Sequence, residues 1–262
     1  MLKYINKLQD KRVLVLGGTS GIGFCVAEAC VEHGARVIVA SSRQTNIDKT
    51  IQRIQTSYPE AGDRISGKTC DLSGDDMEDQ IKSLYDFATD NNTNKLDHVV
   101  NTAGDSFKLV KLADATYEDA MKMGKVRYFG GLFLAKHAST YMNVSAESSF
   151  TNTSGVNSEK PGENFSAIIG FATAKEGMTR GLAKDMKPIR VNCVSPGAVQ
   201  TELFSQFGDE ATVKSIVEKF KALTLTGTIG TPENLAESYL YCMKNYFVTG
   251  RTLQAEGGYL LI

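Results

Sequence analysis

The sequence predicts an α/β protein built on one doubly wound, parallel, seven-stranded sheet with helices on both faces. Apolar runs alternate with helical patterns along the chain, which is typical of this class. Several runs, such as Arg36-Val37-Ile38-Val39-Ala40, are continuously apolar, as in parallel strands covered on both faces. A glycine-rich turn also joins the first run to the first helical pattern. Because ligands of such sheets bind at the carboxyl ends of the strands, we expect the site there.

Each expected strand is an apolar run that ends at turn residues, and each expected helix is an intervening segment with helical periodicity. The strands are expected at 12–16, 36–40, 65–70, 96–101, 147–153, 189–194 and 251–255. The helices are expected at 21–33, 46–57, 75–90, 115–141, 165–185, 211–221 and 232–244. Nothing linker-like divides the chain, so we expect residues 1–262 to form a single domain.

The bulk composition is that of an ordinary soluble globule, with 42% hydrophobic residues and a net charge of −1. The 29 basic residues are scattered among 30 acidic ones, which predicts no nucleic-acid partner. No apolar stretch approaches the roughly 20 residues of a membrane span, and the N-terminus lacks a signal core, so we expect a cytoplasmic protein. The five dispersed cysteines are expected to be buried, reduced thiols, and the three histidines lack metal-ligand spacing, so we expect no metal.

The glycine-rich turn, Gly17-Gly18-Thr19-Ser20-Gly21-Ile22-Gly23, follows the first expected strand and opens the first helix. Its first glycines permit a tight turn and bring backbone N–H groups close to a pyrophosphate, and Gly23 permits close packing of helix and strand. Asn101-Thr102-Ala103-Gly104 and Ser195-Pro196-Gly197 stand at the ends of two further apolar runs.

These motifs, in this order and spacing, resemble the short-chain dehydrogenase/reductase family over nearly the whole chain. The resemblance implies a Rossmann fold that binds a nicotinamide cofactor. It implies adenine contacts from Asp71 and the adjacent Leu72, and a ribose site lined by Asn101, Ala103 and Gly104. The segment with Pro196, Gly197, Val199 and Thr201 would meet the nicotinamide end.

The end of the second strand favours NADPH over NADH. The segment reads Ala40-Ser41-Ser42-Arg43, without the carboxylate that an NAD site uses for the ribose 2′-hydroxyl. Arg43 is able to form charge-assisted hydrogen bonds to a 2′-phosphate instead. The alternative, a solvated arginine at a helix start, leaves the missing acid unexplained.

The family's catalytic side chains are replaced. When Gly177-Met178-Thr179-Arg180 is matched to the end of the active-site helix, the family's tyrosine and lysine positions hold Ile168 and Ala172. Its serine position holds Gly155, and its asparagine position holds Arg127, with a one-residue ambiguity toward Tyr128. Phe171 and Lys175 have the Tyr-x-x-x-Lys spacing but lie three residues out of register, so we expect no part in hydride transfer for Lys175.

Arg127 and Glu163 are the candidate catalytic residues. Arg127 lies in the stripe Ala120, Gly124, Arg127, Gly131, Leu134, Ala138, on a helix face that should pack on the sheet, so its charge needs a partner. That partner is either a structural carboxylate or a group of the substrate. Glu163, in the loop between the lost serine and tyrosine positions, would stabilise a cation or move a proton, or else lie on the surface.

Without the hydroxyls that support carbonyl reduction, we expect an NADPH-dependent reductase of a bulky, apolar imine or iminium, because a cation accepts hydride without an acid. The departures are also similar to those of fungal reductase/Diels–Alderases, which implies a possible [4+2] cyclisation of the reduced product. The alternatives are a non-catalytic NADP(H)-binding sensor or scaffold, and a carbonyl reductase whose acid is Glu163 or Tyr128. The resemblance also implies a homo-oligomer, a tetramer or dimer.

Overall fold

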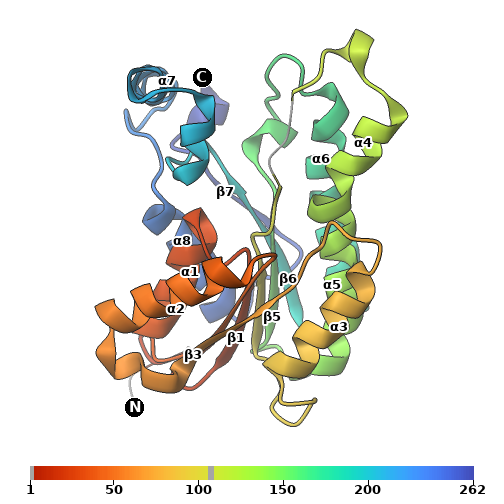
Figure 1. The fold of residues 1–262 in the computed structure, drawn as a ribbon, viewed down its shortest axis with the longest axis vertical. Coiled ribbons are helices and arrows are strands. Elements are labelled where there is room, and N and C mark those ends of the chain that lie inside the picture. The colour runs from red at the N-terminus through yellow and green to blue at the C-terminus, as the bar shows by residue number, and fades with distance from the viewer. Residues whose placement is uncertain (1–2, 106–108) are drawn as a thin grey trace.

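The computed structural model describes residues 3–105 and 109–262. All seven strands join one parallel sheet in the order β3-β2-β1-β4-β5-β6-β7 (Figure 1). The strands are β1 (Arg12–Leu16), β2 (Arg36–Ser41), β3 (Ile65–Thr69), β4 (His98–Asn101), β5 (Ser149–Thr153), β6 (Arg190–Pro196) and β7 (Thr252–Ala255). The predicted fold class and all seven strand positions are confirmed.

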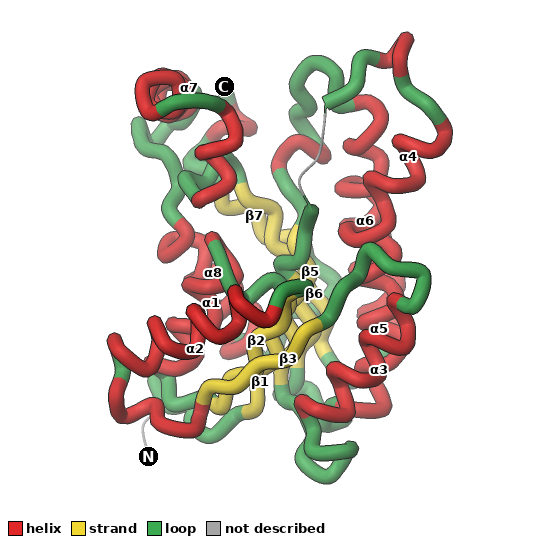
Figure 2. The backbone as a smooth tube through the Cα atoms, in the orientation of Figure 1, coloured by secondary structure: helices red, strands yellow, loops and turns green. Residues whose placement is uncertain are grey.

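Two separate cores cover the two faces of the sheet, as expected for strands that are apolar throughout. One core packs α1 (Gly21–Glu32), α2 (Gln44–Ser57) and α8 (Pro232–Lys244) on the sheet. The other packs α3 (Met77–Ala88), α5 (Gly130–Tyr141) and α6 (Ser166–Asp185) on the opposite face. Figures 1 and 2 show these groups on either side of the strands, with α7 (Glu210–Ala222) beyond the carboxyl end of the sheet.

The helix expected at 115–141 is interrupted. It consists of α4 (Tyr117–Gly124), one turn of π-helix at Lys125–Phe129, and α5. A π-turn contains an extra residue, so it shifts the face presented by the residues that follow, and such turns are frequent at functional sites. Arg127 lies within this turn, which a regular 3.6-residue period did not predict.

Strands β2 and β3 are added on one side of β1, and β4 and the later strands on its other side, so the strand order reverses between β1 and β4. The glycine turn follows the carboxyl end of β1, and Asn101 ends β4. The two loops touch: a Cβ on Gly17 would lie 2.8 Å from Thr102 Oγ1, and Gly17 has a φ of +73°. Only glycine fits this close approach and this backbone conformation. In the described part of the chain, no helix has the length and apolarity needed to cross a membrane.

Candidate active site

A cleft opens at the carboxyl ends of β1, β2, β3 and β4, at the point where the sheet reverses direction. Its lining includes ten of the expected cofactor residues: Gly17, Thr19, Ser20, Ser41, Ser42, Arg43, Asp71, Leu72, Ala103 and Gly104. The loops that follow four adjacent strands therefore converge on one site, as ligand binding at the reversal point of a doubly wound sheet requires.

The glycine turn has the geometry of a phosphate-binding loop. A Cβ on Gly23 would lie 2.3 Å from the carbonyl oxygen of Gly17, so any larger residue would push the start of α1 away from the turn. The N–H of Gly21 donates a 2.9 Å hydrogen bond to Oε2 of Glu202. A carboxylate thus sits at the positive N-terminal end of α1, which is the kind of position where an anionic phosphate binds.

One side of the cleft is arranged around one carboxylate and one exposed cation. Asp71 accepts hydrogen bonds from Ser73 Oγ at 2.7 Å and Ser73 N at 2.9 Å, and these bonds lower the pKa of Asp71. Arg43, the exposed residue that precedes α2, lines the cleft with Asn46 and with no acid from β2. This donor set fits a dinucleotide.

The other expected cofactor residues lie around the cleft rather than in its lining. Asn101 is fully buried, donates from Nδ2 to Asn152 at 3.2 Å and accepts from Ala103 N at 3.2 Å. It therefore shapes the loop and does not face a ligand. Gly21, Ile22 and Gly23 open α1, and the methyl of Thr201 lies against Gly21. Pro196, Gly197 and Val199 follow from the end of β6, and Gly197 N donates to Ala255.

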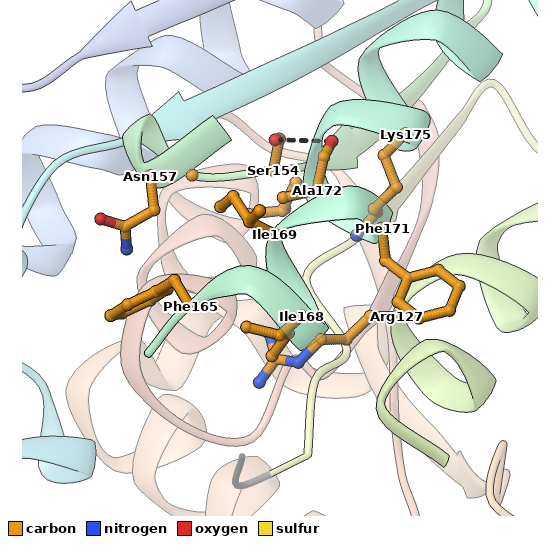
Figure 3. Close-up of a pocket in the computed structure, with 11 residues that line it drawn as sticks. Arg127, Ser154, Asn157, Phe165, Ile168, Ile169, Phe171, Ala172 and Lys175 are labelled. Carbon is orange, nitrogen blue, oxygen red and sulfur yellow. Dashed lines mark hydrogen bonds between the residues drawn. The ribbon is translucent and has the colours of Figure 1, made fainter. Parts of the chain in front are cut away.

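A second pocket lies beside this cleft, between β5, α6 and the π-turn (Figure 3). Its lining consists of Arg127, Thr153, Ser154, Gly155, Asn157, Phe165, Ile168, Ile169, Phe171, Ala172 and Lys175. Gly155, Ile168 and Ala172, which come from distant parts of the motif, meet in this pocket as the register predicted. None of the three offers a hydroxyl or an amine, so the tyrosine and serine chemistry has no side chain at these positions.

Ser154 does not replace the missing serine. Its Oγ donates to Glu176 Oε1 at 2.9 Å and lies 3.2 Å from the carbonyl oxygen of Ala172 (Figure 3). Ser158 Oγ donates to the same Glu176 oxygen at 2.6 Å. Glu176 therefore links the end of β5 and the turn Val156–Ser158 to α6 through hydrogen bonds. The hydroxyl of Ser154 is engaged in one of these bonds.

Arg127 has a protein partner. Its Nε lies 3.2 Å from Asp105 Oδ1, and its Nη2 donates to the carbonyl oxygen of Asp105. Burial lowers the pKa of Arg127, and the charge of Asp105 opposes that shift. The guanidinium also packs on Gly104, where a Cβ would lie 2.8 Å from Nη1. Arg127 thus joins the two pockets: it lines the second and holds the loop that lines the first.

The two other proposed proton donors are placed elsewhere. Glu163 is exposed in the loop before α6 and does not belong to the lining of either pocket. Tyr128 packs against the rings of Phe129 and Phe171, at centroid distances of 5.2 and 6.0 Å, and lines neither pocket. The expected reach of Glu163 into the site is therefore not seen, because the whole segment 161–164 is exposed to solvent.

The sequence motif did not predict that Lys175 lines this pocket. This side chain is only 4% exposed and lines the pocket with Ile168 and Ala172. Lys175 follows Ile168 by seven residues and Ala172 by three. Helix positions with these separations lie on the same face, so Lys175 also points to this side of α6. The i, i+4, i+7 spacing of Ile168, Ala172 and Lys175 was the available signal. Phe171 also lines the pocket, and its ring packs closely against Gly124 of α4.

Comparison with known proteins agrees with this architecture. The SDR-like Rossmann domain family matches residues 4–262. The short-chain dehydrogenase/reductase ucsE of an Acremonium species is 42% identical over 258 residues, which cover 98% of this chain and 97% of that protein. The chain therefore belongs to the short-chain dehydrogenase/reductase family, and it is an oxidoreductase of that type with a fold that binds a nicotinamide cofactor.

Two solved structures show how closely the fold is shared. The structure of the MalC reductase/Diels–Alderase from Malbranchea aurantiaca is 36% identical, with a TM-score of 0.92, and the match covers 98% of this chain and 99% of that one. A small-chain dehydrogenase in complex with NADPH is 28% identical, with a TM-score of 0.77, and the match covers 97% of this chain and 100% of that one. The chain thus shares its whole fold with a bifunctional relative.

Proposed function

We propose that this protein is an NADPH-dependent reductase of a bulky imine or iminium, and that its pocket also shapes the reduced product for a [4+2] cyclisation. The observation that carries the proposal is the convergence of Gly155, Ile168 and Ala172 in one pocket beside the cofactor cleft. Carbonyl reduction develops negative charge on oxygen and requires a donor there. A carbon–nitrogen electrophile that is protonated or permanently charged avoids that requirement.

NADPH is supported by the exposed Arg43 and the serines beside it in a cleft that receives no acid from β2. When bound, this cofactor would supply the hydride. The turn Gly17–Gly23 would hold its pyrophosphate, Asp71 its adenine, and Arg43 with Ser42 a 2′-phosphate. The lining of Phe165, Ile168, Ile169 and Phe171 supports an apolar substrate. We also propose a homo-oligomer and a cytoplasmic location.

The cyclisation is supported by the likeness to the MalC reductase/Diels–Alderase, whose description names that activity. A pocket without catalytic hydroxyls accelerates such a reaction by holding diene and dienophile in a reactive pose. Removing the phenyl ring of Phe165 with Phe165→Ala should therefore change the ratio of cyclised isomers more than the rate of hydride transfer.

Single-turnover oxidation of NADPH tests the reductase. Purified protein is mixed with NADPH and either a bulky cyclic iminium salt or the ketone of the same shape. Turnover of the iminium alone supports the proposal. Turnover of the ketone would show that the pocket supplies an acid to oxygen, and cofactor binding without turnover of either compound would show a sensor or scaffold.

A further inference from the structure

Lys175 is a buried amine without a fixed role in the fold. In the ranges 3–105 and 109–262, its Nζ makes no hydrogen bond or ion pair with protein groups, although the side chain is 4% exposed. Buried lysines are normally paired, because an isolated ammonium in an apolar environment is costly. Its amine end is turned into the pocket, on the same side of α6 as Ala172 and toward Arg127 (Figure 3).

The groups around Lys175 favour loss of its proton. Arg127 contributes a like charge from the π-turn, and Cys193 faces it from β6 as a neutral thiol, because burial raises the pKa of Cys193 to about 12. Burial is the main cause that lowers the pKa of Lys175 to about 8; Cys193 opposes this shift, and Arg127 adds a smaller lowering. An amine with this pKa exchanges its proton near neutral pH.

Within the part of the chain that the structure describes, the remaining elements that pack against α6 add no counter-charge at this amine. Neither β5 nor the turn Val156–Ser158 contains a titratable side chain. On α4, Glu118 and Lys122 are exposed, and Asp119 is held by Thr116 Oγ1 at 2.6 Å. On α6 itself, Glu176 is directed to Ser154 and Ser158. In the π-turn, Lys125 pairs with Asp75 at 2.7 Å.

We infer that Lys175 is the catalytic acid of this pocket and that its substrate is a neutral imine, which it protonates as hydride arrives. This inference rests on the proposed reductase function and names its substrate class. The N–H bond of the Lys175 ammonium breaks and an N–H bond forms at the imine nitrogen. Hydride from NADPH forms a C–H bond at the imine carbon, giving an amine and NADP⁺, and the neutral Lys175 regains a proton from water.

Electrostatic repulsion in the pocket favours a neutral imine over a preformed iminium. A permanent cation would add a second positive charge beside the Lys175 ammonium, and like charges in a partly desolvated pocket repel. Proton transfer to a neutral imine moves the existing charge and adds none. Arg127 is already balanced by Asp105, so the transferable charge of the pocket is that of Lys175.

The test compares two probes, a bulky aryl-substituted cyclic imine and its N-methyl iminium salt, with wild-type protein, Lys175→Met and Lys175→Arg. Lys184→Met, an exposed lysine on the same helix, is the matched control. General acid catalysis contributes about 10²- to 10⁴-fold. We expect Lys175→Met to lose that factor with the neutral imine and to show no loss with the salt, whose charge the variant no longer repels. Arginine keeps the charge but does not release its proton, so Lys175→Arg should not rescue the imine reaction.

A second measurement does not depend on turnover. A protonated imine absorbs at longer wavelength than a neutral one, so binding of the imine to wild-type protein with NADP⁺ should produce this shift, and binding to Lys175→Met should not. Wild-type turnover of the imine should fall as pH rises through about 8, with no such fall for the salt.

The possible failures are distinguishable. Equal losses with both probes, rescue by arginine, or weakened NADPH binding by Lys175→Met would make Lys175 a positioning residue and overturn the inference, while the reductase proposal stands. Wild-type imine turnover that survives in Lys175→Met would overturn it as well. If wild-type protein reduces neither probe, the proposed function itself fails.

Discussion

Replacing Lys175 with methionine should make the protein more stable. At neutral pH the folded protein holds an ammonium that has no hydrogen-bond or ion-pair partner among the described residues, and its pKa is lowered from 10.5 to about 8. That difference corresponds to about 3 kcal/mol of unfavourable free energy for the charged form. Methionine has a similar length and no charge, so Lys175→Met should gain stability of this order at pH 7.

The gain should depend on pH in a defined direction. Below about pH 8 the lysine is protonated in both the folded and the unfolded state, so the full penalty applies. Between about pH 8 and 10.5 the folded state loses its proton first, so wild-type stability rises relative to the variant. Above 10.5 both states are neutral and the difference disappears.

Urea unfolding followed by circular dichroism at pH 6.5, 8.5 and 10 measures this difference. Subtracting wild type from the variant removes the titration of groups that both proteins share. Lys184→Met, which changes an exposed lysine, should stay within about 0.5 kcal/mol of wild type at every pH. A Lys175→Met variant that is less stable than wild type, or whose difference does not change with pH, would show that the amine is paired in solution and would refute the reasoning.

Four further substitutions test the other assignments. Arg43→Glu should weaken NADPH binding about 10- to 100-fold in fluorescence titrations and leave NADH binding unchanged or improved, and an unchanged preference would mean that Arg43 is only solvated. Glu202→Gln should strengthen NADPH binding about tenfold, because the carboxylate no longer competes for the N–H of Gly21, and equal or weaker binding would rule out that competition. Arg127→Ala should lower turnover about 10- to 1000-fold, and a lower Tm with unchanged turnover per folded molecule would limit Arg127 to a structural pair. Glu163→Gln should keep kcat within about twofold of wild type, whereas a large loss would show that this exposed residue takes part in the reaction.

The sequence by itself determined the sheet, the phosphate turn and the replacement of the catalytic set. These features depend on short-range patterns: apolar runs, glycines at a turn, and motif spacing along one chain. Gly155 and Ile168 were placed at the same site by matching the chain to the family's motif, and the structure brings them together in one pocket. Local steric rules and hydrophobic periodicity are sufficient for such features because they act between neighbours in the sequence.

Only the tertiary structure decided which charged side chains face the substrate pocket. Glu163 and Lys175 lie within twelve residues of each other, yet the first is exposed and the second is buried at the pocket. Nothing in the sequence fixed the π-turn that sets the direction of Arg127, or its pairing with Asp105 across a different loop. These outcomes depend on how helix faces pack on the sheet and on the burial that packing imposes. A charge acquires a shifted pKa and a partner only when elements distant in the sequence enclose it.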